Sequence, residues 1–264
     1  MKPPLLFLHG VTRRGQSAAP LLPALTLAYD VFMPDFPGHG NSPRRPGRYR
    51  LVDQAESAQN FLEGLDREPA VVYGHSMGAM VAAAVAADIP SRVKAVILED
   101  PPFDTMGARI HESALYSYFS GFRRFAGDIR PVTELARELA DFRYGPPGAE
   151  AATRLGDERD AAALRFTARC MQLLDPDVFT PILDGTWLEG YNTHAIFERI
   201  QCPVLLLQAD PTAGGMLTDG DAAIVTNICK DVTHLKFPGG PHNLHWMETD
   251  KTLRAVMNFL SSLY

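Results

Sequence analysis

The sequence predicts an α/β fold: a doubly wound, mostly parallel sheet of about six strands with a helical insertion. Short, wholly apolar runs alternate with helical patterns through the first hundred residues and again after residue 201, which is typical of buried parallel strands joined by crossover helices. Strand-like runs are missing between residues 103 and 200. Ligands of such sheets bind beyond the carboxyl ends of the strands, so we expect the functional residues there.

The length of 264 residues suits a single α/β domain that carries an inserted subdomain. We therefore divide the chain into a first part of the core (1–102), a helical cap (103–200) and a second part of the core (201–264). Within the cap, residues 131–142 and 149–174 have amphipathic helical patterns.

In chain order, the core strands and helices are expected to alternate. The apolar run at 5–8 ends at His9-Gly10, and the run at 30–33 leads into a loop rich in glycine and proline. The other predicted strands cover 71–75, 93–98, 202–208 and 232–237, and the predicted helices cover 19–28, 51–65, 79–87, 221–228 and 250–260.

The segment around Ser76 carries the strongest indication of chemistry. An apolar run is followed by Gly74-His75-Ser76-Met77-Gly78 and then by an alanine-rich helix. In a Gly-x-Ser-x-Gly turn between strand and helix, the serine takes a strained conformation that leaves its hydroxyl exposed above the sheet. The free N–H groups at the start of the helix stabilise negative charge beside it. We interpret Ser76 as a nucleophile; the alternative is a tight turn with an inert serine.

Composition excludes several classes of protein. A net charge of −6 argues against nucleic acid as a partner, because binding phosphates needs a basic surface. No apolar run approaches the length of a membrane span, and the first residues lead directly into a strand, so we expect a cytoplasmic protein that does not bind a membrane. The three cysteines lack the spacing of a zinc site or a disulfide framework. We expect a small-molecule partner.

Four stretches together resemble the α/β-hydrolase superfamily. They are His9-Gly10, the run from Asp35 to Ser42, the Ser76 turn and Gly240-x-His242, each at the carboxyl end of a predicted strand. The resemblance implies a serine nucleophile, a helical cap and chemistry without a cofactor or metal. The superfamily has two further strands before the His-Gly loop, which this sequence lacks. An edge uncovered by that loss favours a homo-oligomer or a covering loop.

The resemblance also assigns roles. His242 lies where the superfamily keeps its catalytic base, with His245 as a local competitor, and backbone N–H groups of Val11 and Met77 would form the oxyanion hole. The acid stays open between Asp100, at the end of a strand, and Asp210, after the next-to-last one. By strand alternation, Glu99 should face the opposite side from Asp100.

The function that follows is hydrolysis of a carboxylic ester or lactone by a Ser-His-Asp triad through an acyl-enzyme. Carbon–carbon bond hydrolysis, perhydrolysis of the haloperoxidase type and acyl transfer use the same residues and remain alternatives. A further alternative, of another class, is a slow-turnover ligand receptor. Arg13 and Arg14 could meet a substrate carboxylate, although exposed arginines are usually solvated.

Overall fold

A single parallel sheet forms the centre of the protein. The computed structural model describes residues 1–148 and 152–263, and within them the sheet has six strands in the order β2-β1-β3-β4-β7-β8, all neighbours running parallel. The predicted doubly wound sheet of about six strands is confirmed. The strands are β1 (Pro4–Leu8), β2 (Asp30–Phe32), β3 (Ala70–His75), β4 (Val93–Glu99), β7 (Val204–Ala209) and β8 (Val232–Phe237).

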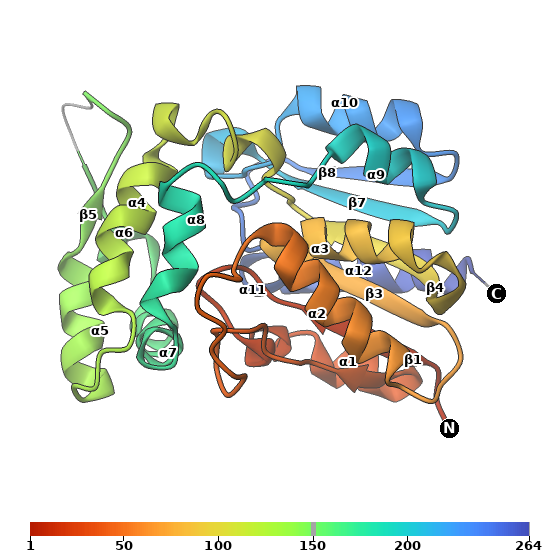
Figure 1. Cartoon of the computed structure of the whole chain (residues 1–264), viewed down its shortest axis with the longest axis horizontal. Helices are drawn as coiled ribbons and strands as arrows, with labels where there is room; N and C mark the ends of the chain where they lie inside the picture. Colours follow the sequence, from red (N-terminus) through yellow and green to blue (C-terminus); the bar gives the residue numbers. More distant parts are fainter. Residues whose placement is uncertain (149–151, 264) are drawn as a thin grey trace.

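Helices cover both faces of the sheet, which explains why its central strands β1, β3, β4 and β7 are buried at almost every position. Leu6 and Val72 pack on one side, while Leu5 and Val71 pack on the other. The first side is covered by α2 (Leu51–Glu63), α3 (Met77–Asp88), α9 (Thr193–Arg199) and α10 (Asp219–Ile228), and the second by α1 (Leu22–Ala28) and α12 (Thr249–Ser261). Figure 1 shows α2 and α3 in front of the sheet and α12 behind it.

Most of the segment 103–200 lies at one end of the sheet, on the left in Figure 1. Its helices are α4 (Ala114–Phe122), α5 (Val132–Asp141), α6 (Leu155–Glu158), α7 (Ala161–Gln172) and α8 (Thr180–Leu183), followed by α9. Helix α9 packs against α3 and α10, in the layer of the core helices. The division of the chain at residues 103 and 200 stays a prediction.

Two expectations for this segment were wrong. Strands β5 (Arg143–Tyr144) and β6 (Thr153–Arg154) form a small antiparallel pair, and two residues are too few to produce an alternating pattern. The helix predicted over 149–174 is divided into α6 and α7. Asp160 caps α7 by accepting a hydrogen bond from the Ala163 N–H, so a helix starts there. Residues 149–151 lie outside the described part of the chain.

The helix predicted over 19–28 is also shorter than expected. A 3₁₀ turn (Gly15–Ala18) precedes α1, and α1 begins at Leu22 with Pro23 in its first turn, where the missing N–H costs little. The remaining short helices are α11 (Leu244–Met247) and the 3₁₀ turns Pro90–Arg92, Phe103–Thr105, Ile110–Glu112, Arg123–Phe125, Pro176–Phe179 and Pro211–Ala213. None of the helices in the described residues is both long and apolar enough to cross a membrane.

Candidate active site

Ser76 lies at the junction of β3 and α3 in the strained conformation that its sequence motif predicts. Its backbone has φ +57° and ψ −122°, a combination that residues other than glycine rarely adopt. A Cβ at Gly74 would lie 2.0 Å from the Gly78 carbonyl oxygen, and a Cβ at Gly78 would lie 2.0 Å from that of Leu8. Both glycines are therefore required by close packing of backbone against backbone. The N–H of Ser76 donates to the Glu99 carbonyl at 2.9 Å, which ties the turn to β4.

Asp100 and His242 are hydrogen bonded to each other at the edge of the sheet where Ser76 lies. The Nδ1 atom of His242 lies 2.6 Å from Oδ2 of Asp100. Asp100 follows β4 at φ +45° and is completely buried, and its carboxylate also accepts from the backbone N–H groups of Ala209, Met216 and Leu217. These donors stabilise the ionised carboxylate and fix its direction. Because Nδ1 is used by Asp100, the Nε2 atom of His242 is left for other chemistry.

His242 is also held next to the serine turn. Its carbonyl oxygen accepts a hydrogen bond from His75 Nε2 at 3.1 Å, and the rings of His75 and His242 lie 4.7 Å apart. The described side chains of Ser76 and His242 are not hydrogen bonded to each other. Such contacts are often long without substrate and tighten in the substrate complex. The side chain of His242 is 15% exposed, so a substrate can reach its ring.

Asp210, the alternative acid, is used to organise loops. Its carboxylate accepts from the Gly239 N–H at 2.8 Å and from the backbone and hydroxyl of Thr212 at 2.8 and 2.7 Å. The hydrogen bond from Gly239, followed by those from Thr212, lowers the pKa of Asp210 below its ordinary value. The structure thus places Asp100, and not Asp210, against His242.

Two residues close to Ser76 have peptide N–H groups of interest, Val11 in the loop after β1 and Met77 at the start of α3. Val11 and Met77 are buried, and neither of their N–H groups donates to any residue in the described ranges. Buried N–H groups are nearly always paired, so two free ones beside Ser76 need an explanation. A Cβ on Gly10 would lie 3.3 Å from the Ser76 Cβ, which places this loop directly next to the serine.

Two buried histidines hold that loop. His9 Nε2 accepts from the Phe36 N–H at 3.0 Å while its Nδ1 donates to the Gly10 carbonyl, and His39 Nε2 donates to the carbonyl of Val11. Burial lowers the pKa of both rings, and that of His9 falls well below its ordinary value. His39 therefore fixes the peptide that precedes Thr12.

A second histidine and carboxylate pair lies behind the first. Glu99 accepts from the backbone N–H and Nδ1 of His245 at 3.0 and 2.7 Å, and from the Tyr73 hydroxyl at 2.6 Å. All three residues are buried, and burial raises the pKa of Tyr73 well above its ordinary value. Together with His75, the pair offers ligand atoms within 4.8 Å of one another, the one group of metal-ligating type found among the described residues. The sequence contains no motif at this spacing.

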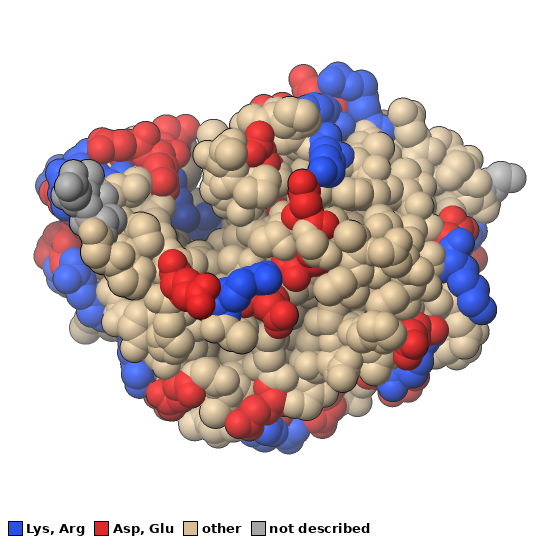
Figure 2. Space-filling model, turned by 90° about the horizontal axis from the view of Figure 1, so that it is seen from above, with Lys and Arg blue, Asp and Glu red and all other residues tan. Residues whose placement is uncertain are grey.

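The segment 103–200 contacts the site through α7 (Ala161–Gln172). The ring of Phe166 lies 5.4 Å from that of Trp246, whose indole N–H donates to the Ser17 carbonyl at 2.8 Å. Thr167, the next residue of α7, accepts a hydrogen bond from Arg13. Figure 2 shows a hollow toward the left of the molecule, with Lys or Arg side chains visible inside it.

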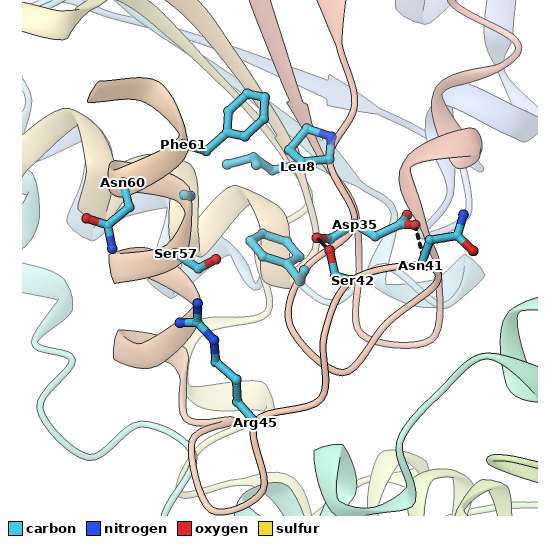
Figure 3. A pocket seen from close by; sticks show the side chains of 11 residues that line it. Leu8, Asp35, Asn41, Ser42, Arg45, Ser57, Asn60 and Phe61 are labelled. Carbon is cyan, nitrogen blue, oxygen red and sulfur yellow. Dashed lines mark hydrogen bonds between the residues drawn. The ribbon is translucent and has the colours of Figure 1, made fainter. Parts of the chain in front are cut away.

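A separate cavity of about 520 Å³ lies between α2 and the loop after β2. Figure 3 shows Asp35, Asn41 and Ser42 on one side of it and Ser57, Asn60 and Phe61 on the other, with Arg45 below them. Asp35 is committed to the backbone of Gly15 and Asn41. Neither Ser76, His242 nor Asp100 lines this cavity, so it is separate from the candidate site.

Comparison with known proteins identifies the family. The family described as "alpha/beta hydrolase fold" matches residues 3–249, and the chain belongs to it. A relative from Rhodobacter capsulatus, the "Magnesium-chelatase 30 kDa subunit", is 39% identical over 98% of this chain and 87% of its own length. A "2-(acetamidomethylene)succinate hydrolase" from Mesorhizobium japonicum is 23% identical over 98% of this chain and 88% of its own.

Solved structures agree on the fold. The enol-lactonase from Burkholderia xenovorans LB400 superposes with a TM-score of 0.72 at 16% identity, over 99% of this chain and 92% of that one. Identity at that level shows the fold alone. Membership of the family, together with relatives named as hydrolases, supports a hydrolase; the bond cleaved and the roles of individual residues go beyond the comparisons.

Proposed function

We propose that the protein is a serine hydrolase that cleaves a small-molecule carboxylic ester or lactone through Ser76, His242 and Asp100. The observation that carries this proposal is the 2.6 Å hydrogen bond between His242 and Asp100, beside a serine held at φ +57°. A serine hydroxyl is a poor nucleophile at its free pKa and needs a base whose direction is fixed by a third group.

The reaction proceeds in two steps. His242 Nε2 takes the proton of the Ser76 hydroxyl as the oxygen attacks the substrate carbonyl, and the same proton then passes to the leaving alkoxide. With an ester the first product, an alcohol, departs and leaves an acyl group bonded to Ser76, whereas with a lactone the alcohol stays attached to that acyl group. Water, deprotonated by His242, attacks this acyl group, and the proton returns to Ser76 as the carboxylic acid product departs. Asp100 holds the imidazole in the required tautomer throughout.

The unpaired N–H groups of Val11 and Met77 serve as the oxyanion hole in this proposal. Each would donate to the carbonyl oxygen as it becomes an anion, and one such donor contributes about 3 kcal/mol to lowering the barrier. The observations that support it are their burial, their lack of partners among the described residues and the contact of Gly10 with Ser76. Carbon–carbon bond hydrolysis, perhydrolysis and acyl transfer would use the same groups and remain alternatives.

A test follows from the nucleophile. The purified protein should hydrolyse short p-nitrophenyl esters and be labelled at Ser76 by a fluorophosphonate probe. Ser76→Ala should lose at least about a thousandfold in kcat and all labelling. Ser120→Ala, which changes an exposed serine on α4, is the matched control and should retain both. Unchanged turnover in Ser76→Ala would refute the proposal.

The name of the Rhodobacter relative favours a second candidate, a chain that binds a ligand as a subunit of a larger assembly and turns it over slowly or not at all. The same experiment separates the two. Tight ligand binding without labelling or ester turnover supports the subunit, and fast turnover supports the enzyme.

A further inference from the structure

Two arginines from distant parts of the chain meet between the cap and the loop after β1. Arg13 lies two residues after Val11, and Arg159 lies between α6 and α7 of the cap. Each directs one Nη1 atom at the same hydroxyl, that of Thr167 on α7, at 2.9 and 3.2 Å. Arg159 also donates to the Tyr118 hydroxyl at 3.0 Å. Two like charges are therefore held close together by neutral partners.

Neither guanidinium has an acidic partner within the described residues. Two other half-exposed arginines do: Arg109 pairs with Asp221 at 2.6 Å, and Arg130 pairs with Asp128 at 2.5 Å. The neighbouring Arg14 has a buried Nε atom that is likewise without a hydrogen-bond partner. Partly buried cations are normally paired, because removing them from water is costly.

The hydroxyl of Thr167 cannot neutralise this charge. It accepts from both arginines and donates to the Ala163 carbonyl at 2.9 Å, so its bonding capacity is used up. Burial, and next the positive charge of Arg159, lowers the pKa of Arg13 to about 10. Arg13 is still protonated at neutral pH, and a bound anion would stabilise its positive charge.

The pair lies next to the candidate active site. Arg13 follows the loop whose Gly10 contacts Ser76, and its charge is among those that lower the pKa of His75. Thr167 follows Phe166, which packs on Trp246, four residues after His242. A ligand held by both arginines would bridge core and cap within reach of the serine.

We propose that Arg13 and Arg159 bind a carboxylate of the substrate, so that the compound hydrolysed is an ester or lactone with a free carboxylate a few atoms from the scissile carbonyl. The inference rests on the proposed function and specifies its substrate class. A planar carboxylate offers one oxygen to each guanidinium, and charge-assisted hydrogen bonds of this kind are about twice as strong as neutral ones.

The test compares two esters of equal chain length, p-nitrophenyl butyrate and the mono-p-nitrophenyl ester of succinate. The wild-type protein should prefer the succinate ester, and added salt should weaken that preference. In Arg13→Gln and in Arg159→Gln the ratio of the two kcat/KM values should fall at least about tenfold. Arg165→Gln, an exposed arginine of α7, removes one charge from the same helix and should leave the ratio unchanged.

Binding is measured separately from turnover. Isothermal titration calorimetry of Ser76→Ala with glutarate should show binding, and this binding should be lost in the double variant Ser76→Ala/Arg13→Gln. Inorganic phosphate should bind to Ser76→Ala more weakly than glutarate does. Phosphate binding more tightly would overturn the assignment of a carboxylate.

The outcomes keep the two proposals apart. If p-nitrophenyl butyrate is hydrolysed through Ser76 but the wild type shows no preference for the succinate ester, the anion site is refuted and the hydrolase proposal stands. If glutarate binds through Arg13 but neither ester is cleaved, the anion site stands and the hydrolase is refuted. The wild-type comparison needs no variant, so misfolding of a variant would not hide the result.

Discussion

Two neighbouring carboxylates, Glu99 and Asp100, each hold a histidine of the same loop. Glu99, the last residue of β4, binds His245 on one side of the sheet, and Asp100, just beyond it, binds His242. Strand alternation predicts opposite directions for adjacent side chains, which is how sequence reasoning could separate the two. Sequence reasoning left the choice of acid open between Asp100 and Asp210, because both residues follow strands that end at the same edge of the sheet. Only the packed loop shows that Asp210 is occupied by Gly239 and Thr212.

Replacing the acid tests this difference at single residues. Asp100→Asn should lower kcat at least about a thousandfold, because an amide in place of the carboxylate favours the wrong imidazole tautomer and cannot balance its positive charge. Asp210→Asn should lower kcat less than about threefold, since its contacts are confined to loop backbone and Thr212. Steady-state kinetics with a p-nitrophenyl ester measures both, with thermal unfolding as the check that each variant is folded. Equal, small losses would remove Asp100 from the mechanism.

At the scale of elements, the turn between β3 and α3 determines the site. Its conformation follows from local sequence, since Gly74 and Gly78 are the residues that allow α3 to lie against β1. Helix α3 is buried all round, and its alanines keep it close to the sheet. The serine therefore stands at a fixed position relative to β4 and the loop that carries His242.

A methyl group at Gly78 should disrupt this arrangement. In Gly78→Ala the new Cβ would meet the Leu8 carbonyl oxygen at 2.0 Å, and backbone on both sides would have to move. We expect a loss of about 3 kcal/mol or more in the free energy of unfolding, measured by urea denaturation. Gly220→Ala in α10 is the control, because the nearest atom to its Cβ lies at 3.8 Å. That change should be neutral or slightly stabilising, and equal losses in both variants would contradict the packing argument.

The parts of the fold that sequence could predict are those fixed by local patterns. The six strands, the serine turn and the order of the core helices follow from apolar runs and from glycine positions. The division of 149–174 follows from a single capping residue, Asp160, and the β5–β6 pair joins strands of two residues each, so neither leaves a periodic signal. The Arg13 and Arg159 pair likewise joins residues 146 positions apart through Thr167, so only the folded chain brings them together.

At the scale of the whole molecule, several histidines are enclosed in the neutral form around the site. His9 and His75 are completely or almost completely buried, and burial lowers the pKa of both well below the ordinary value. For His75 the nearby His242 and His245 act in the same direction. In the unfolded chain each ring returns to a pKa of about 6.5.

This difference predicts that stability falls on mild acidification. Above pH 6.5 both states are neutral at these rings, and stability does not depend on them. Below it the unfolded chain binds protons that the folded chain excludes, so each ring lowers the free energy of unfolding by up to about 1.4 kcal/mol per pH unit until its folded-state pKa is reached. Urea denaturation between pH 7.5 and 5.5 measures the slope above the range where carboxylates titrate. His194, which is 63% exposed, supplies the control: His194→Gln should retain the wild-type slope and His9→Gln should reduce it. If the free energy of unfolding stays constant or increases as the pH is lowered from 7.5 to 5.5, the fold does not hold the histidines around the serine in the neutral form.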